Sequence, residues 1–449
     1  MAAKEIAIAR TDAAPARPIH GLRWIIVGLI FLATCINYID RSSIGLLVTK
    51  FGADIDVSSK QYGYIGSLLL LSYTISQTVS GRLYDRFGAR IGFSVSIVVW
   101  CLAAMAHSLM TGVVSFAVCS MFLGLGEAGN WPGAAKVIAE WFPQQERAVG
   151  MAIFNSGGST GGMIAPLLVA GFLAPHFGWR ITFLIIGVLG FIWLAAWLVF
   201  YYPLAEHPRV SPEERALIRE GQPPVTASNL RPVSYRALLR QRQTWGILLA
   251  RFCVDPIWWL YLLWLPTYLK EVRHFSVKDI GLSAWLPYAA AAAGALFGGW
   301  FAGRLIRSGM SVNAGRRTAI AIGACMMPFG IFAARAHSAY AALACIAVVL
   351  FGFQMWIANV QTLPSDYFSH AQVGAVAGMG GTAAGIASLM FNMATAPMAH
   401  RFGYGFVLTI AGVLAPLGLG LLWFVGGPIY RLTIAEPRDG EVISDAPIL

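Results

Sequence analysis

Residues 30–48 read IFLATCINYIDRSSIGLLV. A helix needs about 20 mainly apolar residues to cross the hydrocarbon of a bilayer, and this stretch has that length and composition. It nevertheless carries Asp40 and Arg41 side by side near its middle. Charge at that depth costs about 2.5–3.5 kcal/mol per residue on insertion scales, and residues that bear this cost are most often functional. The stretch therefore predicts a membrane helix that takes part in the function of the protein.

Apolar segments of this kind recur along the whole chain. Of its 449 residues, 57% are hydrophobic and 12% are charged, whereas a soluble domain has about 25% charged residues. Segments of alternating polarity are absent from the sequence, which excludes a transmembrane β-barrel. The sequence predicts an all-α polytopic membrane protein with twelve transmembrane helices. We place them at residues 24–47, 61–83, 91–110, 112–138, 149–174, 181–202, 245–268, 280–305, 317–335, 338–364, 374–398 and 404–426.

A polar stretch divides six of these helices from the other six. PHFGWRITFLIIGVLG (175–190) is similar to HRFGYGFVLTIAGVLA (400–415), which indicates an internal repeat. Repeated halves are typical of secondary transporters, whose substrate sites lie near the bilayer midplane between the halves. We therefore predict two pseudo-symmetric six-helix halves, 1–202 and 245–449, the second with a short cytoplasmic tail. A cytoplasmic linker, 203–244, joins them.

The net charge of +11 is explained by topology. Most arginines fall in the loops that are cytoplasmic if the N-terminus is inside, which is the positive-inside rule. We expect a multi-pass protein of the bacterial inner membrane with both termini cytoplasmic and no nucleic-acid partner. The polar first 20 residues lack the apolar core of a cleaved signal, so the first helix should be retained. Six cysteines without paired spacing predict no metal site.

Three acids lie well inside predicted helices: Asp40, Glu127 and Asp255. The helical rise of about 1.5 Å per residue places Asp40 and Glu127 at similar depth on helices that run in opposite directions. Because adjacent residues point about 100° apart, we expect Arg41 to face the cavity and Asp40 to face a neighbouring helix. Burial disfavours an ionised carboxylate and a nearby arginine favours it, so such a group can exchange a proton near neutral pH. Asp40 and Glu127 are thus candidate proton-coupling residues, and a structural ion network between helices is the alternative.

Glu127 lies in GLGEAGNWPG (124–133). Its glycines permit close helix approach, and Pro132 leaves a backbone carbonyl without its helical partner. The segment predicts a local irregularity in the helix beside the acid.

The seventh predicted helix contains RFCVDPIWWLYLLWLP (251–266), in which Arg251 and Asp255 can pair along one face. Either this pair only neutralises itself, or Arg251 grips a substrate carboxylate in a bidentate manner while Trp258 stacks on the substrate. Four uncharged polar residues in other helices, Tyr38, Tyr73, Asn155 and Asn392, are further candidates for substrate binding. Hydrogen bonding between helices is an equally open reading of each.

Nucleotide chemistry has no support. GMGGTAAG (378–385) lacks the strand and downstream acid of a dinucleotide-binding unit, and no GK[ST] phosphate loop occurs. Together with NSGGSTGG (155–162), it predicts close packing of helices through small residues. We expect a transporter without a cofactor rather than an enzyme or an ATP-driven pump.

GRLYDRFGAR (81–90) and WFPQQERAVG (141–150) resemble the cytoplasmic gating segments of the major facilitator superfamily. The resemblance implies that fold and a cytoplasmic latch formed in the outward-open state. The gating positions that it implies are Gly81, Asp85, Arg86, Arg90, Glu146 and Arg147. GGWFAGRLIRSG (298–309) places Gly303 where an acid would match Asp85, so a symmetric second latch is not expected.

NYIDR (37–41), GLGEAGNWPGAAKVIAEWFPQQER (124–147) and FNSGGSTGG (154–162) are similar to the anion:cation symporter family. RFCVDPIWWLYLLWLP and FNMATAPMAHRFGY (391–404) look closest to its bacterial hexuronate branch, the galacturonate and glucuronate transporters. The resemblance implies proton-coupled import of a sugar-acid anion by a monomer through alternating access, with H+ favoured over Na+. It assigns proton coupling to Asp40 and Glu127 and substrate binding to Arg41, Tyr38, Tyr73 and Asn392, and it places Arg251 where aldonate transporters have an amide.

Three other functions stay open at this point. The first is symport of another organic anion, such as an aldonate, an aldarate or an aromatic acid. The second is a proton-driven exporter of cationic compounds, against which the arginines at membrane depth argue. The third is a transporter-like sensor, for which the linker and tail leave little room for a signalling domain.

Overall fold

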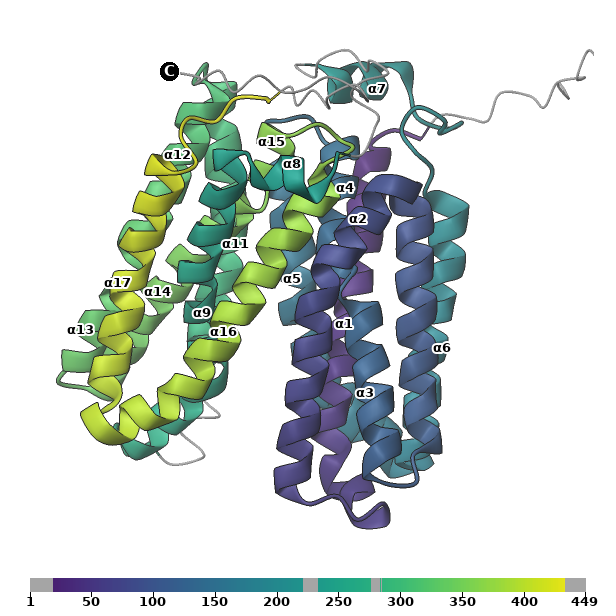
Figure 1. Ribbon diagram of the computed structural model, residues 1–449, viewed down its shortest axis with the longest axis vertical. Coiled ribbons are helices and arrows are strands. Elements are labelled where there is room, and N and C mark those ends of the chain that lie inside the picture. The colour runs from purple at the N-terminus through teal and green to yellow at the C-terminus, as the bar shows by residue number, and fades with distance from the viewer. Residues whose placement is uncertain (1–18, 221–232, 276–282, 284, 433–449) are drawn as a thin grey trace, which may run out of the picture.

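The computed structural model describes residues 19–220, 233–275, 283 and 285–432, and its regular elements in these ranges are helices. Two bundles stand side by side, coloured purple to blue and green to yellow (Figure 1). The first contains α1 (Leu22–Asp54), α2 (Ser59–Ala106), α3 (Val113–Glu127), α4 (Asn130–Trp141), α5 (Arg147–Ala165) and α6 (Ala174–Phe200). The second contains α9 (Arg242–Glu271), α11 (Leu286–Arg307), α12 (Val312–Met326), α13 (Phe329–Arg335), α14 (Ala339–Val360), α15 (Leu363–Tyr367), α16 (Val373–Phe402) and α17 (Tyr404–Phe424). Between them lie α7 (Pro212–Arg219) and α8 (Tyr235–Leu239).

Ten stretches of the described chain are long and apolar enough to span a membrane. Two of them are double length, because α2 bends at Gly88 (φ 79°) and the stretch from α5 to α6 bends at Gly178 (φ 74°). Dividing both at these glycines yields the twelve transmembrane helices expected from the sequence. Gly309 (φ 102°) and Gly403 (φ 80°) make the corresponding turns in the second half. A positive φ favours glycine, so the same residue ends a helix at equivalent places of the repeat.

The halves have separate apolar cores. One buried cluster extends from Leu22 to Ile218, and another from Leu238 to Leu422. The ends of the described chain lie on the side of α7 and α8, which we call the linker side: Ile19 N donates to Arg209 O at 2.9 Å and Leu432 N to Tyr367 O at 2.7 Å. The expected N-terminal segment, the middle of the linker and the C-terminal tail lie outside the described residues.

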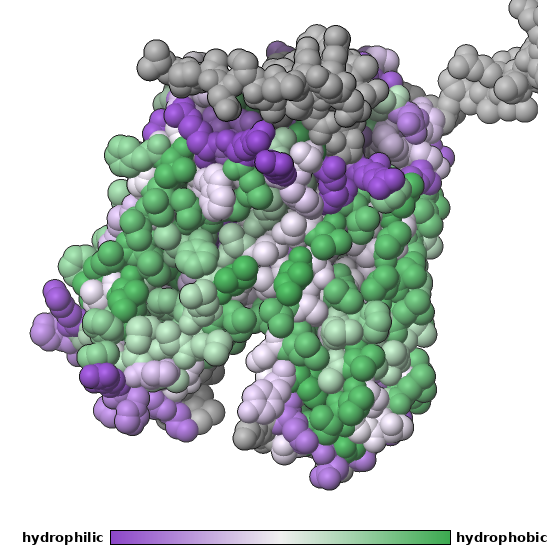
Figure 2. Space-filling view, viewed as in Figure 1, coloured by the Kyte–Doolittle hydropathy of each residue, from purple (hydrophilic) through white to green (hydrophobic). Residues whose placement is uncertain are grey.

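The halves touch near the linker side and separate toward the opposite side, where a cleft opens between them (Figure 2). Apolar residues cover most of the visible face, with hydrophilic residues at its two ends, as a bilayer requires. The closest approach joins α2 to α16: a Cβ at Gly378 would lie 2.2 Å from Gln77 O, and one at Gly385 2.5 Å from Thr74 Oγ1. The close-packing interpretation of residues 378–385 is confirmed, since only glycine permits this contact.

Glycine is equally necessary inside the first half. A Cβ on Gly126 would lie 2.5 Å from Trp100 N, a backbone atom that cannot move aside. We therefore expect Gly126→Ala to reduce the free energy of unfolding by about 1–3 kcal/mol through overpacking. A lowered midpoint of thermal unfolding in detergent would show this. Gly28→Ala is the matched control, because nothing lies within 4 Å of that position, and it should not lower the midpoint. Equal midpoints for both variants would contradict the prediction.

Candidate functional site

The site is centred on an ion pair between α1 and α3. Arg41 Nη2 and Nε donate to Glu127 Oε2 at 2.6 and 3.0 Å. The Glu127 side chain is fully buried, whereas that of Arg41 is 20% exposed. α3 ends at Glu127 and α4 begins at Asn130, so the helix irregularity expected from the glycines and Pro132 is confirmed. This break places an acid at a helix end within the membrane interior.

Aromatic rings hold the Arg41 guanidinium. Its carbon lies 4.6 Å from the ring centre of Tyr73 and 5.8 Å from that of Tyr38, within the range of a cation–π interaction. Tyr73 is followed by Thr74, whose carbonyl accepts a hydrogen bond from Thr382 Oγ1 of α16 at 2.7 Å. The ion pair therefore lies close to the contact between the two halves.

Asp40 has a different environment. Its side chain is fully buried, and neither carboxylate oxygen has a hydrogen-bond partner among the described residues. Asn37, one turn earlier, is likewise buried with both side-chain polar atoms unpaired there. The partly exposed Arg41 and the enclosed Asp40 follow the division expected from their 100° separation.

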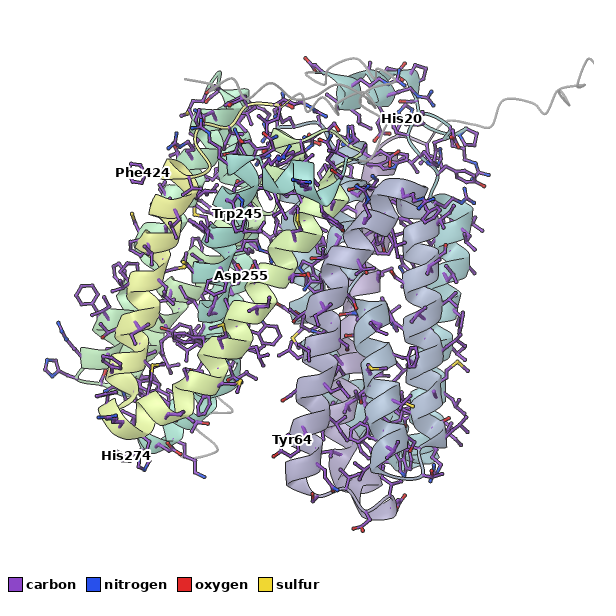
Figure 3. All side chains as sticks on the ribbon, in the orientation of Figure 1. His20, Tyr64, Trp245, Asp255, His274 and Phe424 are labelled. Carbon is purple, nitrogen blue, oxygen red and sulfur yellow. The ribbon has the colours of Figure 1, made fainter. Side chains whose placement is uncertain are left out.

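A second ion pair lies in the other half, on α9. Arg251 Nη2 and Nε donate to Asp255 Oδ2 at 2.7 and 3.1 Å, so the pairing expected from their spacing is confirmed. Asp255 lies about midway along the half (Figure 3).

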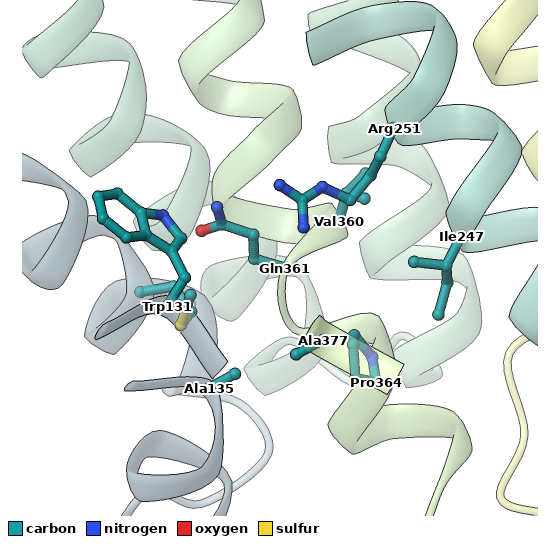
Figure 4. A pocket seen from close by; sticks show the side chains of 9 residues that line it. Trp131, Ala135, Ile247, Arg251, Val360, Gln361, Pro364 and Ala377 are labelled. Carbon is teal, nitrogen blue, oxygen red and sulfur yellow. The ribbon is translucent and has the colours of Figure 1, made fainter. Parts of the chain in front are cut away.

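Arg251 reaches a small pocket between the halves. Figure 4 shows its guanidinium directed toward Gln361 and Trp131. The lining residues are Trp131, Ala135 and Met151 from the first half, and Ile247, Arg251, Val360, Gln361, Pro364 and Ala377 from the second. The pocket volume is ≈ 10 Å³, about enough for one water molecule. Asn155 Nδ2 of the first half donates to Gln361 Oε1 of the second at 2.8 Å, so a hydrogen bond joins the two halves beside this pocket.

The structure places Trp258 and Asn392 in contacts within the second half. Trp258 stacks on Phe353 at 5.7 Å between ring centres, and Asn392 Oδ1 accepts from Trp264 Nε1 at 2.7 Å. Trp131 and Gln361 line the pocket but were not among the substrate-binding residues predicted from the sequence, although Gln361 is an uncharged polar residue inside a predicted helix. Trp131 follows Glu127 by four residues, and this shared face was the signal that could have found it.

Asp85 fastens α2 to the start of α16. Its Oδ1 accepts from Lys136 Nζ at 2.8 Å and from Gly374 N at 3.0 Å, and its Oδ2 accepts from Ala375 N at 2.7 Å. A carboxylate at a helix N-terminus meets unpaired N–H groups and the positive end of the helix dipole. Gly81 lies at the same crossing, where a Cβ would be 2.1 Å from Gly374 O. Opening the linker side must break these contacts.

A second cluster across the halves surrounds Asp366. Its Oδ2 accepts from Arg316 Nε at 3.1 Å, and its Oδ1 from Gln144 Nε2 at 3.2 Å. Arg147 Nη1 lies 3.6 Å from Oδ1 and donates to Ser365 O at 3.0 Å. The chain thus has a second connection at its linker side, built on α15 instead of the loop between α11 and α12. Nearby, burial lowers the pKa of His370 to about 3, so this imidazole stays neutral.

The other expected gating residues do not cross between the halves. Arg86 is exposed, and Arg90 Nη2 donates to Leu198 O at 2.7 Å. Glu146 accepts from Arg23 Nε at 3.0 Å, and Arg23 Nη1 also donates to Glu214 of α7. These contacts stay within the first half and dock the linker helix on it.

The end of the linker that leads into α9 is held on the first half by contacts that the motifs did not indicate. Arg82 of α2 donates to Val233 O, and Tyr235 of α8 donates to Thr78 O. We expect Tyr235→Phe to shift the equilibrium about 2–10-fold toward the state open on the linker side, because one hydrogen bond is worth about 0.5–1.5 kcal/mol. Electron–electron distance distributions between spin labels at the exposed positions Glu213 and Ser308 would report the shift.

Tyr404→Phe is the matched control for this substitution. Its hydroxyl donates to Glu271 on the opposite side, within the second half, at 3.3 Å. An equal shift in both tyrosine variants, or no shift in Tyr235→Phe, would contradict a role for α8 in closing the linker side.

Comparisons with known proteins fit this geometry. A sequence model of the Major Facilitator Superfamily matches residues 30–391. The hexuronate transporter of Escherichia coli K12 is 32% identical over 415 residues, 91% of this chain and 95% of that one. The galacturonate transporter of Dickeya chrysanthemi is 34% identical over 336 residues, 73% and 96% of the two chains. A probable galactarate/D-glucarate transporter of E. coli K12 is 28% identical over 92% and 97%.

Solved structures show the same fold. The proton:xylose symporter XylE superposes with a TM-score of 0.70 at 16% identity, over 91% of this chain and 98% of that one. The E. coli fucose:proton symporter FucP gives 0.63 at 13% identity, over 90% and 98%. At these identities the likeness concerns the fold alone.

Proposed function

This chain belongs to the major facilitator superfamily, and we propose on that basis that it imports a sugar-acid anion together with protons by alternating access. The substrate class we propose is a hexuronate, galacturonate or glucuronate, as in the relatives of highest identity described above. The observation that carries the proposal is the Arg41–Glu127 ion pair inside the membrane. The family resemblance drawn from the sequence motifs is confirmed. The chain is a transporter and not an enzyme.

The ion pair couples a proton to an anion in a simple way. While Glu127 is ionised, its Oε2 binds the Arg41 guanidinium, with Nη2 at 2.6 Å, so the guanidinium is not available to a substrate. Protonation of Glu127 removes that negative charge, so the guanidinium is free to bind a substrate carboxylate in a bidentate manner. Proton and anion then favour each other's binding, and by linkage the coupling is reciprocal.

Asp40 is the second proton-coupling acid of the proposal. An isolated ionised carboxylate in a low-dielectric interior costs far more than a neutral one, so a buried carboxyl without partners is expected to carry a proton. Asp40 meets this condition among the described residues. Its proton must leave and return as the surrounding helices move.

Import follows from the orientation that we propose. The linker side carries Arg82, Arg86, Arg90 and Arg147, which the positive-inside rule places in the cytoplasm together with both termini. The cleft of Figure 2 then opens to the outside of the bacterial inner membrane. A substrate would enter through this cleft and reach Arg41 before the halves close on the outer side.

Reconstitution of the purified protein in liposomes tests the proposal. We expect uptake of labelled galacturonate to rise when the lumen is made alkaline and to be unaffected by an equal Na+ gradient. Unlabelled glucuronate should compete, whereas galactonate and benzoate should compete weakly. Uptake that ignores the pH gradient, or competition only by a compound without a carboxylate, would overturn it.

A sugar dicarboxylate is the second candidate substrate. Arg251 provides a second guanidinium on the opposite half, and one relative is a probable galactarate/D-glucarate transporter. Competition by galactarate stronger than that by galacturonate would favour this class.

A further inference from the structure

The two arginine–carboxylate pairs in the membrane interior have the same bonding pattern. In each pair the arginine Nε and Nη2 both donate to one carboxylate oxygen, Oε2 of Glu127 and Oδ2 of Asp255. The other oxygen of each acid, Oε1 and Oδ1, is buried and has no hydrogen-bond partner among the described residues. One pair comes from each half of the protein.

Buried acids near the linker side differ from these two. Both oxygens of Asp85 accept hydrogen bonds, and the same holds for Asp366. Glu214 also uses both oxygens, accepting from Leu22 N and Arg23 N. These three buried acids, which hold structural contacts near the linker side, thus use both of their oxygens. Asp255 groups with Asp40 and Glu127, which are the acids of the proposed proton coupling.

We propose that Asp255 is a further proton-binding group of the transport cycle, and that its protonation releases Arg251 toward the substrate as protonation of Glu127 releases Arg41. This proposal rests on the proposed proton-coupled transport. A carboxylate with one unused oxygen can accept a proton without first losing a structural hydrogen bond. The bond that forms and later breaks is the O–H bond of the Asp255 carboxyl: its proton is gained on one side of the membrane and lost on the other.

The surroundings of Asp255 leave Arg251 as its electrostatic partner. α14 and α17, which pack against α9, contain no Asp, Glu, Lys, Arg or His. On α16 the ionisable residues are His400 and Arg401, at the far end of that helix. On the linker side, α8 carries Arg236 and α15 carries Asp366, which is bound to Arg316. Arg251 is thus the charged group that pairs with Asp255 at this level of α9.

A released Arg251 lies where a substrate can meet it. Its guanidinium lines the pocket between the halves beside Trp131 and Gln361 (Figure 4). Gly380 of α16 leaves room for it, since a Cβ there would lie 3.3 Å from Arg251 Nη1. The side chains of Arg251 and Asp255 are 11% and 10% exposed, and Arg251 is the member of the pair that lines the pocket.

The number of protons carried per substrate tests the proposal. Liposomes with the membrane potential clamped at zero and a pH difference of about one unit would be loaded to the limiting accumulation of labelled galacturonate. Each cotransported proton multiplies that limit by about ten, because one pH unit corresponds to about 1.36 kcal/mol. We expect Asp255→Asn to lower the limit about tenfold relative to the wild-type chain. Asp54→Asn, whose carboxylate accepts from Trp179 Nε1 at 2.6 Å, is the matched control and should not lower it.

The double variant Arg251→Gln/Asp255→Asn removes the proton site without leaving a buried unpaired charge, so it provides the same readout if Asp255→Asn does not fold. A reduced rate with an unchanged limit in these variants would overturn the proposal and leave Asp255 as a counter-ion only. If the wild-type chain itself shows no accumulation under the pH gradient, the proposed function fails first, and this inference fails with it.

Discussion

Glu127→Gln is expected to lower the accumulation of the sugar acid against its gradient by at least about tenfold, while exchange of substrate across the membrane continues. Glutamine has nearly the same shape but cannot gain or lose a proton, so it imitates the protonated acid in every step. Arg41, which Glu127 holds at 2.6 Å, then remains available to the substrate throughout the cycle. Limiting accumulation under a pH gradient of about one unit should fall at least about tenfold, because one proton fewer is carried. Counterflow between substrate-loaded liposomes and a labelled bath should persist.

Glu271→Gln is the control for this experiment. Glu271 accepts from Tyr404 on the open side of the second half, away from the ion pair. It should accumulate substrate as the wild-type chain does. Accumulation by Glu127→Gln to the wild-type limit would contradict the coupling role of Glu127, and loss of counterflow together with accumulation would show that the acid is needed for substrate binding itself.

Arg41→Lys is expected to reduce kcat/KM for the sugar acid by about 30-fold or more. Lysine retains the charge but not the planar pair of donors that matches a carboxylate, and the loss of one partner of a buried, hydrogen-bonded charge pair costs about 2–5 kcal/mol. If most of the loss in kcat/KM comes from a higher KM, the defect lies in substrate binding. Initial rates of labelled uptake over a range of substrate concentrations would separate the two constants.

The comparison variant for Arg41 is Arg180→Lys. Arg180 donates to Ser108 O at 2.9 Å near the open end of the first half and has no place in the proposed site. Its kcat/KM should stay within a few-fold of the wild-type value. An Arg41→Lys protein with nearly normal kcat/KM would mean that charge alone attracts the substrate, without bidentate recognition.

The membrane fold could be predicted because its signals are local. A helix that spans a bilayer needs only a continuous apolar stretch, and the transfer free energy of that stretch is a sum over its own residues. The turns followed the same logic, since Gly178 and Gly403 stand at matching places in the quoted repeat and both adopt a positive φ. The helix break after Glu127 was likewise visible in its glycines and Pro132.

The latch was predictable only in part. The motif around Asp85 pointed to the linker side, but its partners on α16 are backbone N–H groups, and no residue type marks them. The second cluster was not predicted, because Gly303 stands where an acid would match Asp85; a Cβ at Gly303 would lie 2.6 Å from Gln145 O. Asp366 does the joining instead, with Arg316 and Arg147 from distant parts of the chain.

The sequence by itself determined the helices, the side on which the basic loops gather, and the set of five charged residues in the membrane interior. It also determined that Arg251 would pair with Asp255, since both lie on one face of one helix. Only the tertiary structure decided that Arg41 forms its ion pair with Glu127, and that Asp40 is buried without a hydrogen-bond partner among the described residues. Hydrophobic length and helical spacing depend on neighbours in the chain. An ion pair between helices depends on distances across 86 residues of sequence, which packing alone sets.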